Sequence, residues 1–128
     1  MAKYPFTYKG KRIIVHPKLN GSTKEVTYNF LLDTGAEVTV IDDTVAQGLG
    51  YDLDSVKQTS PFLSATGDGT AKIVHLKKLE LLGRKEKNFR VYVCKFPIGM
   101  VDGLIGVDFM VRLHAMKINF DAQEIEVT

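Results

Sequence analysis

Phe30-Leu31-Leu32-Asp33-Thr34-Gly35-Ala36 is the stretch of this 128-residue chain that decides its fold. The three residues before Asp33 are apolar or aromatic and predict a buried strand, and the small residues after it predict a tight turn. A lone carboxylate at the end of a buried strand is costly and requires a partner. The chain contains no second Asp-Thr-Gly and no Asp-Ser-Gly, so a paired Asp would have to come from a second copy of the molecule.

The composition is that of one soluble globular domain, with 45% apolar and 25% charged residues and a net charge of +2. The densest basic stretch, 84–87, contains an acid and is interpreted as a solvated turn, so no nucleic-acid partner is expected. Cys94 is the only cysteine, which excludes a disulfide framework and Cys-based metal sites. It is interpreted as a core thiol.

The sequence shows no signal peptide and no transmembrane stretch, so we expect a cytoplasmic location and no membrane contact by this domain. The alternative is a domain excised from a longer anchored or precursor protein. Three histidines have neither the spacing nor the neighbours of metal ligands, and no metal or other cofactor is expected. They are His16, His75 and His114.

Segments with the alternation of half-buried strands recur along most of the chain. The predicted strands are 12–16, 25–32, 38–41, 58–65, 70–82, 89–93, 103–106, 116–120 and 124–127. A turn is expected over 83–87. A single helical turn is expected after Asp42, and a second short helix is expected over 109–113. Short strands every eight to twelve residues favour an all-β closed barrel or sandwich.

Three features together resemble the retropepsin-like aspartic proteases, single-domain dimeric enzymes of retroviruses, retroelements and bacteria. They are the segment 32–36, a two-glycine hairpin around residues 67–69 and the segment 102–109, which is closest to the bacterial branch. The resemblance covers about residues 10–128. It implies an all-β closed barrel of short antiparallel strands with one short C-terminal helix and a flap hairpin. Residues 1–9 would form an N-terminal extension, either part of an interface or disordered.

The resemblance implies a homodimeric aspartic endopeptidase that needs no metal and no covalent intermediate. Asp33 of each subunit would supply one carboxylate of a pair, and a water held between them would attack the peptide bond. Thr34 would bond across the pair to the other subunit's backbone. Gly35 would let the backbone approach the carboxylates, because any Cβ there would intrude.

The resemblance also implies a site for an extended polypeptide substrate. Ala36 is small for the same crowded turn, and Glu37 would either bind substrate N–H groups or be a solvated acid. Leu31 and Leu104 would line apolar pockets beside the scissile bond, or would simply belong to the core. The flap tip would be a four-residue turn, which could equally be a plain surface hairpin. It consists of Thr66, Gly67, Asp68 and Gly69.

One position departs from the retroviral pattern. Retroviral enzymes usually carry Arg after the second glycine, where this chain has Val107. The ion pair that steadies the retroviral dimer is therefore absent, and the retroviral interface with interleaved terminal strands transfers poorly. Two alternatives stay open: a retropepsin-fold peptide-binding or dimerisation module with little or no activity, and a β-barrel binding domain with a coincidental Asp-Thr-Gly.

Overall fold

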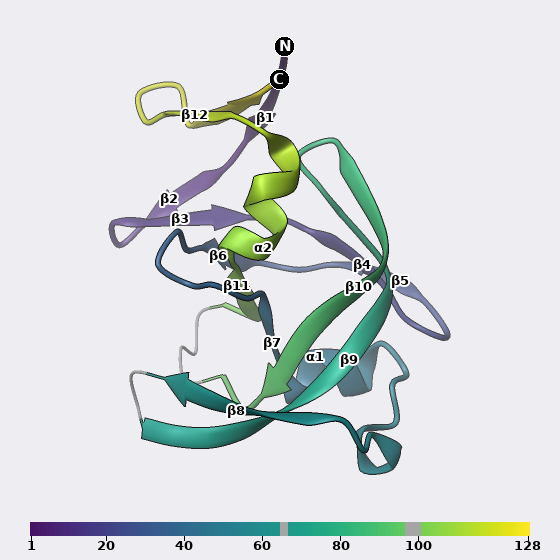
Figure 1. Ribbon diagram of the computed structural model, residues 1–128. Helices are drawn as coiled ribbons and strands as arrows, with labels where there is room; N and C mark the ends of the chain where they lie inside the picture. The colour runs from purple at the N-terminus through teal and green to yellow at the C-terminus, as the bar shows by residue number, and fades with distance from the viewer. Residues whose placement is uncertain (65–66, 97–100) are drawn as a thin grey trace.

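The computed structural model of this chain describes residues 1–64, 67–96 and 101–128. A ten-stranded sheet makes up most of the structure, and a separate three-stranded sheet joins the two termini (Figure 1). The strands of the large sheet are β2 (Thr7–Lys9), β3 (Arg12–Val15), β4 (Lys18–Asn20), β5 (Glu25–Thr27), β6 (Phe30–Leu32), β7 (Val40–Asp42), β8 (Thr59–Ser64), β9 (Gly67–Leu81), β10 (Arg84–Cys94) and β11 (Gly103–Ile105).

The large sheet curls back on itself. Its strand order is β2-β3-β6-β11-β7-β10-β9-β4-β5, with β8 added beside β9. Only His16 and Pro17 separate β3 from β4, yet these strands stand near opposite ends of that order, so the two ends of the sheet meet. The predicted all-β barrel is confirmed, with the difference that the β6–β11 and β7–β10 ladders are parallel.

Alternation along the strands builds the core inside this curl. Phe30, Ile41 and Ile105 are completely buried, and they belong to one continuous apolar cluster. The predicted strand 25–32 is divided into β5 and β6 by Tyr28 and Asn29. The turn expected over 83–87 is shorter, because Leu82 and Gly83 adopt positive φ and β10 already begins at Arg84. The charged residues that follow are therefore strand residues.

The helices are short. They are α1 (Asp43–Gly48), the 3₁₀ helix η1 (Leu53–Ser55), α2 (Val107–Met110) and a 3₁₀ turn, Val111–Leu113, that continues α2. Asp42 caps α1 by accepting a hydrogen bond from the Thr44 amide at 3.2 Å, and it also accepts the Phe96 amide at 2.7 Å. Burial acts to raise the pKa of Asp42, but a hydrogen bond from the Thr44 hydroxyl, the two amide hydrogen bonds and the charge of Lys95 outweigh it and lower the pKa. No helix in the described ranges has the length and apolarity to cross a membrane.

The two termini share one small sheet. β13 (Glu124–Val127) is its central strand, with β1 (Ala2–Pro5) on one edge and β12 (Met116–Asn119) on the other. Figure 1 shows the two chain ends side by side at the top of this sheet. Because both edges of β13 are paired within one chain, this strand has no edge left for a strand from another copy.

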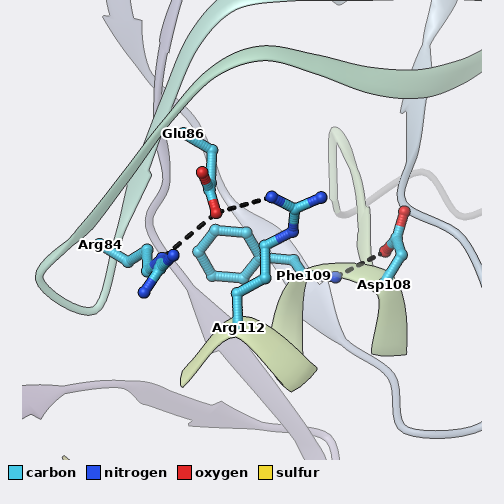
Figure 2. A network of polar contacts seen from close by, with 5 residues as sticks. All are labelled: Arg84, Glu86, Asp108, Phe109 and Arg112. Carbon is cyan, nitrogen blue, oxygen red and sulfur yellow. Dashed lines mark hydrogen bonds and ion pairs between the residues drawn. The ribbon is translucent and has the colours of Figure 1, made fainter. Parts of the chain in front are cut away.

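A charged cluster ties the small helical segment to β10. Glu86 Oε1 accepts hydrogen bonds from Arg112 Nη1 at 2.9 Å and from Arg84 Nε at 3.2 Å (Figure 2). The Arg112 guanidinium also lies 5.3 Å from the centroid of the Phe89 ring, which packs edge-on against Phe109. Burial opposes ionisation of Glu86, but the two arginines outweigh it and lower the pKa of this carboxyl.

Replacing Glu86 with Gln should lower the melting temperature at pH 7 by about 3–5 °C, the shift expected for about 1 kcal/mol in a domain of this size. Because the folded-state pKa is depressed, the stabilisation is present above the unfolded pKa of about 4.3 and is lost as pH falls through the folded value. The measurement is calorimetry from pH 7 to 3, in which the two melting curves should converge. Asp121→Asn, in the exposed β12–β13 turn, is the control. A difference that persists at pH 3 would contradict this origin.

Candidate active site

Asp33 follows β6 directly, at the point where β6 lies beside β11. The Asp33 amide donates to the Ile105 carbonyl at 3.0 Å, which extends the parallel ladder by one bond. The Gly35 amide then donates to Asp33 Oδ1 at 2.9 Å, and the Ala36 amide donates to the Asp33 carbonyl at 3.2 Å. Local hydrogen bonds therefore fix both the turn and the orientation of the carboxylate.

The Asp33 turn lies against the segment that ends at Gly106, and this contact leaves little room for a side chain at either glycine. A Cβ built on Gly106 would stand 2.6 Å from the carbonyl carbon and oxygen of Val38, distances that real Cβ atoms do not show. A Cβ on Gly35 would stand 3.2 Å from Asp33 Oδ1. The Val107 amide donates to the Ala36 carbonyl at 2.8 Å across this contact. Gly106 is thus required by close approach of the backbones, whereas a side chain at Gly35 would instead crowd the Asp33 carboxylate.

A hydrogen-bond network of Thr39 and Asp108, which we call the polar lock, connects the Asp33 turn to α2. Thr39 is completely buried, and its hydroxyl donates to Asp108 Oδ1 at 2.8 Å while accepting the Gly106 amide at 3.1 Å. The Thr39 amide donates to Asp108 Oδ2 at 3.1 Å, and the Asp108 amide donates to the Glu37 carbonyl at 3.2 Å. Every polar atom of the Thr39 side chain is satisfied, so the lock holds the two loops rigidly.

Asp108→Ala should destabilise the protein by about 2–3 kcal/mol, because the buried Thr39 amide and the Thr39 hydroxyl proton both lose their acceptor. Thr39→Val should cost a similar amount. The double variant should cost much less than the sum, since both changes remove the same network. Urea unfolding measures all three, with Thr39→Ser, which keeps the hydroxyl, as the matched control. Additive losses would show that the two residues do not act together.

A continuous row of side chains runs across six strands on the face opposite the core. Strand register places its members directly beside one another: Ile14, Leu31, Leu104, Val40, Tyr92 and Ile73. Three of these, Ile14, Val40 and Ile73, are buried and yet do not join the main core cluster. Asp33 lies two residues beyond Leu31, so alternation places it on the same face. We call this row the floor of the site.

The structure brings Leu31, Leu104 and Asp33 together, and all three are half-buried. Thr34 is exposed, and its hydroxyl makes no hydrogen bond to the described residues. Glu37 is also exposed. Only one Asp-Thr-Gly turn is present in a chain, so one protomer presents a single carboxylate at this position.

The β8–β9 hairpin is the segment expected to form the flap. The prediction of a turn at Gly67, Asp68 and Gly69 is wrong, because these residues begin β9 and pair with β8 in an antiparallel ladder. Thr66, predicted at the tip, lies outside the described residues. In Figure 1 the end of β8 and the start of β9, the loop between β6 and β7 and the turn between β2 and β3 all lie on the left of the structure.

An apolar groove adjoins the Asp33 turn. Its volume is about 370 Å³, and the turn residues 34–37 form one wall while α2 and the following turn form the other. Val107 is 36% exposed and Val111 is 62% exposed, and both line the groove. Two apolar side chains are thus exposed on one wall of the groove.

Cys94 remains a weak candidate for chemistry. It is half-buried, and burial together with the charges of Asp42 and Asp43 raises the pKa of its thiol. A thiol with a raised pKa stays protonated near neutral pH and is a poor nucleophile.

Sequence analysis did not single out Thr39 or the outer members of the floor, Val40, Ile73 and Tyr92. The signal for Thr39 was present, because it is the one polar residue inside the apolar run 38–41. The floor residues carried no such signal. Their common face depends on register between strands far apart in the sequence.

Comparison with known proteins identifies the family and supports the fold. A family model described as aspartyl protease matches residues 15–109. An uncharacterized protein of Rickettsia prowazekii (strain Madrid E) is 30% identical over 107 residues, which are 83% of this chain and 45% of that protein. The chain thus spans about half the length of this curated relative. The crystal structure of a retropepsin-like aspartic protease from Rickettsia conorii superposes with a TM-score of 0.76 at 22% identity, covering 98% of this chain and 89% of that one.

Proposed function

This chain belongs to the aspartyl protease family and has a retropepsin-like fold, and from that premise we propose that it is a homodimeric aspartic endopeptidase. The observation that carries the proposal is the position of Asp33, held by backbone hydrogen bonds at the edge of an apolar floor. One chain supplies one such carboxylate, and a two-fold axis beside the turn would supply the second.

In the proposed reaction the two Asp33 carboxylates share one proton, because two like charges at close range cannot both ionise. The ionised carboxylate takes a proton from a water held between them, and the water oxygen attacks the peptide carbonyl carbon. The protonated carboxyl donates to the carbonyl oxygen as negative charge develops there. Proton transfer to the amide nitrogen then releases the amine product.

The proposed substrate is an extended polypeptide lying between the flap hairpin and the floor. Its backbone would pair with strand edges in the manner of β-augmentation. Leu31 and Leu104 lie directly beside each other on the floor near Asp33, which supports a preference for apolar side chains next to the scissile bond. The β8–β9 hairpin would cover the substrate and exclude water.

We further propose that the dimer is built around the apolar groove. The partner must approach the exposed Thr34, and the groove containing Val107 and Val111 begins at that residue. Apolar burial would then replace the ion pair of the retroviral dimer. Both edges of β13 pair with strands of the same chain, which supports a dimer interface in which the terminal strands of the two subunits do not interleave.

The test of function is digestion of a peptide library by the purified chain between about pH 3 and 7, where a carboxylate pair sharing one proton acts. We expect cleavage within extended peptides at apolar pairs, with specific activity that rises with protein concentration as dimers form. A chain that binds library peptides and cuts none over this range would instead be a peptide-binding module.

A further inference from the structure

A second recess lies at the far end of the floor, where the β2–β3 hairpin begins. Its volume is about 190 Å³, close to the size of one side chain. Most of its lining comes from β2, from β3 and the residue after it, and from the residue before β6: Thr7, Lys9, Arg12, Ile14, His16 and Asn29. None of the residues lining it is acidic.

Strand register makes this recess a continuation of the floor. Thr7 pairs with Ile14, and Ile14 pairs with Leu31, so all three lie on the same face as Asp33. Arg12 and His16 lie two residues to either side of Ile14 and share that face by alternation. A substrate chain crossing the floor beyond Leu31 would therefore arrive at these side chains.

The charges around the recess are unbalanced. Lys9 and Arg12 are exposed, and neither appears in any ion pair among the described residues. Asp102 is not among the residues that line the recess, and its carboxylate accepts a hydrogen bond from the Asn29 backbone amide at 3.1 Å. Two cationic groups thus face a cavity that holds no counter-charge from its own walls.

His16 is held in place in the wall of this recess. His16 Nε2 lies 3.1 Å from Thr7 Oγ1, and His16 Nδ1 lies 2.9 Å from Asn29 Oδ1. An amide oxygen only accepts, so Nδ1 carries the proton in this arrangement. The ring is thereby fixed as a wall of the recess, while the flexible Lys9 and Arg12 supply the charge.

We propose that this recess is a distal substrate subsite that selects an acidic side chain. The proposal rests on the proposed protease function and names a preference of that same site. β3 lies about 5 Å from β6, and an extended peptide advances about 3.3 Å per residue. The acidic residue would therefore stand about two to four positions from the scissile bond.

The chemistry favours a carboxylate over its neutral isostere. Arg12 presents a planar fork that matches a carboxylate, and charge-assisted hydrogen bonds are about twice as strong as neutral ones. Gln in place of Glu would keep the shape and lose that gain. An apolar side chain of similar size would leave the recess partly filled and its donors unpaired.

The experiment compares kcat/KM for peptides that carry Glu, Gln or Leu at each position two to four residues from the scissile bond, assayed at about pH 5.5, above the usual glutamate pKa of about 4.3. We expect the wild type to prefer Glu over Gln by about tenfold at one of these positions. The Lys9→Ala/Arg12→Ala variant should cut both at nearly equal rates. A control with the same loss of charge, Lys85→Ala/Lys117→Ala, should keep the preference.

Each outcome has a distinct meaning. Equal cleavage of Glu and Gln peptides by the wild type overturns the subsite while leaving the protease function intact. If the Lys85→Ala/Lys117→Ala control also loses the preference for Glu, the subsite is overturned, and the preference is a general electrostatic effect. If the Lys9→Ala/Arg12→Ala variant loses activity on every peptide and sediments as a monomer, the hairpin serves the dimer instead. If the wild type cuts none of the peptides, the proposed function and the subsite fall together.

Discussion

Asp33→Asn is expected to abolish peptide cleavage, with kcat lowered by at least about 10³-fold. The amide cannot take a proton from the attacking water, and it cannot share a proton with the other subunit. Residual activity would be limited to what substrate binding and the flap provide. The measurement is cleavage of the best library peptide by wild type and variant, at matched concentrations well above the dimer dissociation constant.

Asn is nearly isosteric with Asp, so the fold should survive the substitution. Its Oδ1 still accepts the Gly35 amide, the bond that orients the side chain. Circular dichroism and sedimentation of the variant should therefore match the wild type. Cleavage that persists in a folded, dimeric Asp33→Asn protein would rule out the carboxylate pair.

Mixing the two proteins provides a sharper test of a site shared between subunits. A heterodimer of wild type and Asp33→Asn holds one carboxylate and should be inactive. With random exchange, activity should therefore fall with the square of the wild-type fraction. A linear fall would mean that each chain carries a complete site.

Val111→Asp is expected to weaken the dimer by at least about tenfold and to remove most activity at low protein concentration. The side chain is 62% exposed in the single chain and lines the groove beside the Asp33 turn. A carboxylate there would be buried without a partner when the second copy docks. Because the residue faces solvent in the monomer, the stability of the monomer should change little.

Sedimentation equilibrium and the concentration dependence of specific activity measure this effect. Activity should return when the Val111→Asp protein is concentrated, since the catalytic residues are untouched. Val111→Thr keeps the shape without the charge and should lie close to wild type. A Val111→Asp protein that stays dimeric and active on dilution would place the interface elsewhere, for example at the free edges of β1 and β12.

Part of this site was predictable from sequence because it is local. The apolar run 30–32 followed by small residues defines a strand and a tight turn without reference to the rest of the chain. The glycine at 106 was equally visible as the end of a second apolar strand. The register of β6 and β11 places Leu31 and Leu104 directly beside each other near Asp33, and their role as substrate pockets stays a prediction.

The polar lock and the floor could not be predicted in the same way. Thr39 and Asp108 are far apart in sequence, and their hydrogen bonds exist only because β11 inserts between β6 and β7. The same insertion aligns Leu104 with Leu31 on one side and Val40 on the other. Period-two alternation predicts which residues share a face of one strand, and it does not predict which strands are neighbours.

The sequence by itself determined the family, the all-β barrel and the single Asp33 turn, because these depend on short motifs and on strand periodicity. Only the tertiary structure decided how the terminal strands pair, which residues form the floor and where exposed valines meet the turn. The pairing of β1 and β12 with β13 in one chain is a matter of register and geometry between distant segments. Such pairings depend on the packing of the whole chain, so no short stretch of sequence predicts them.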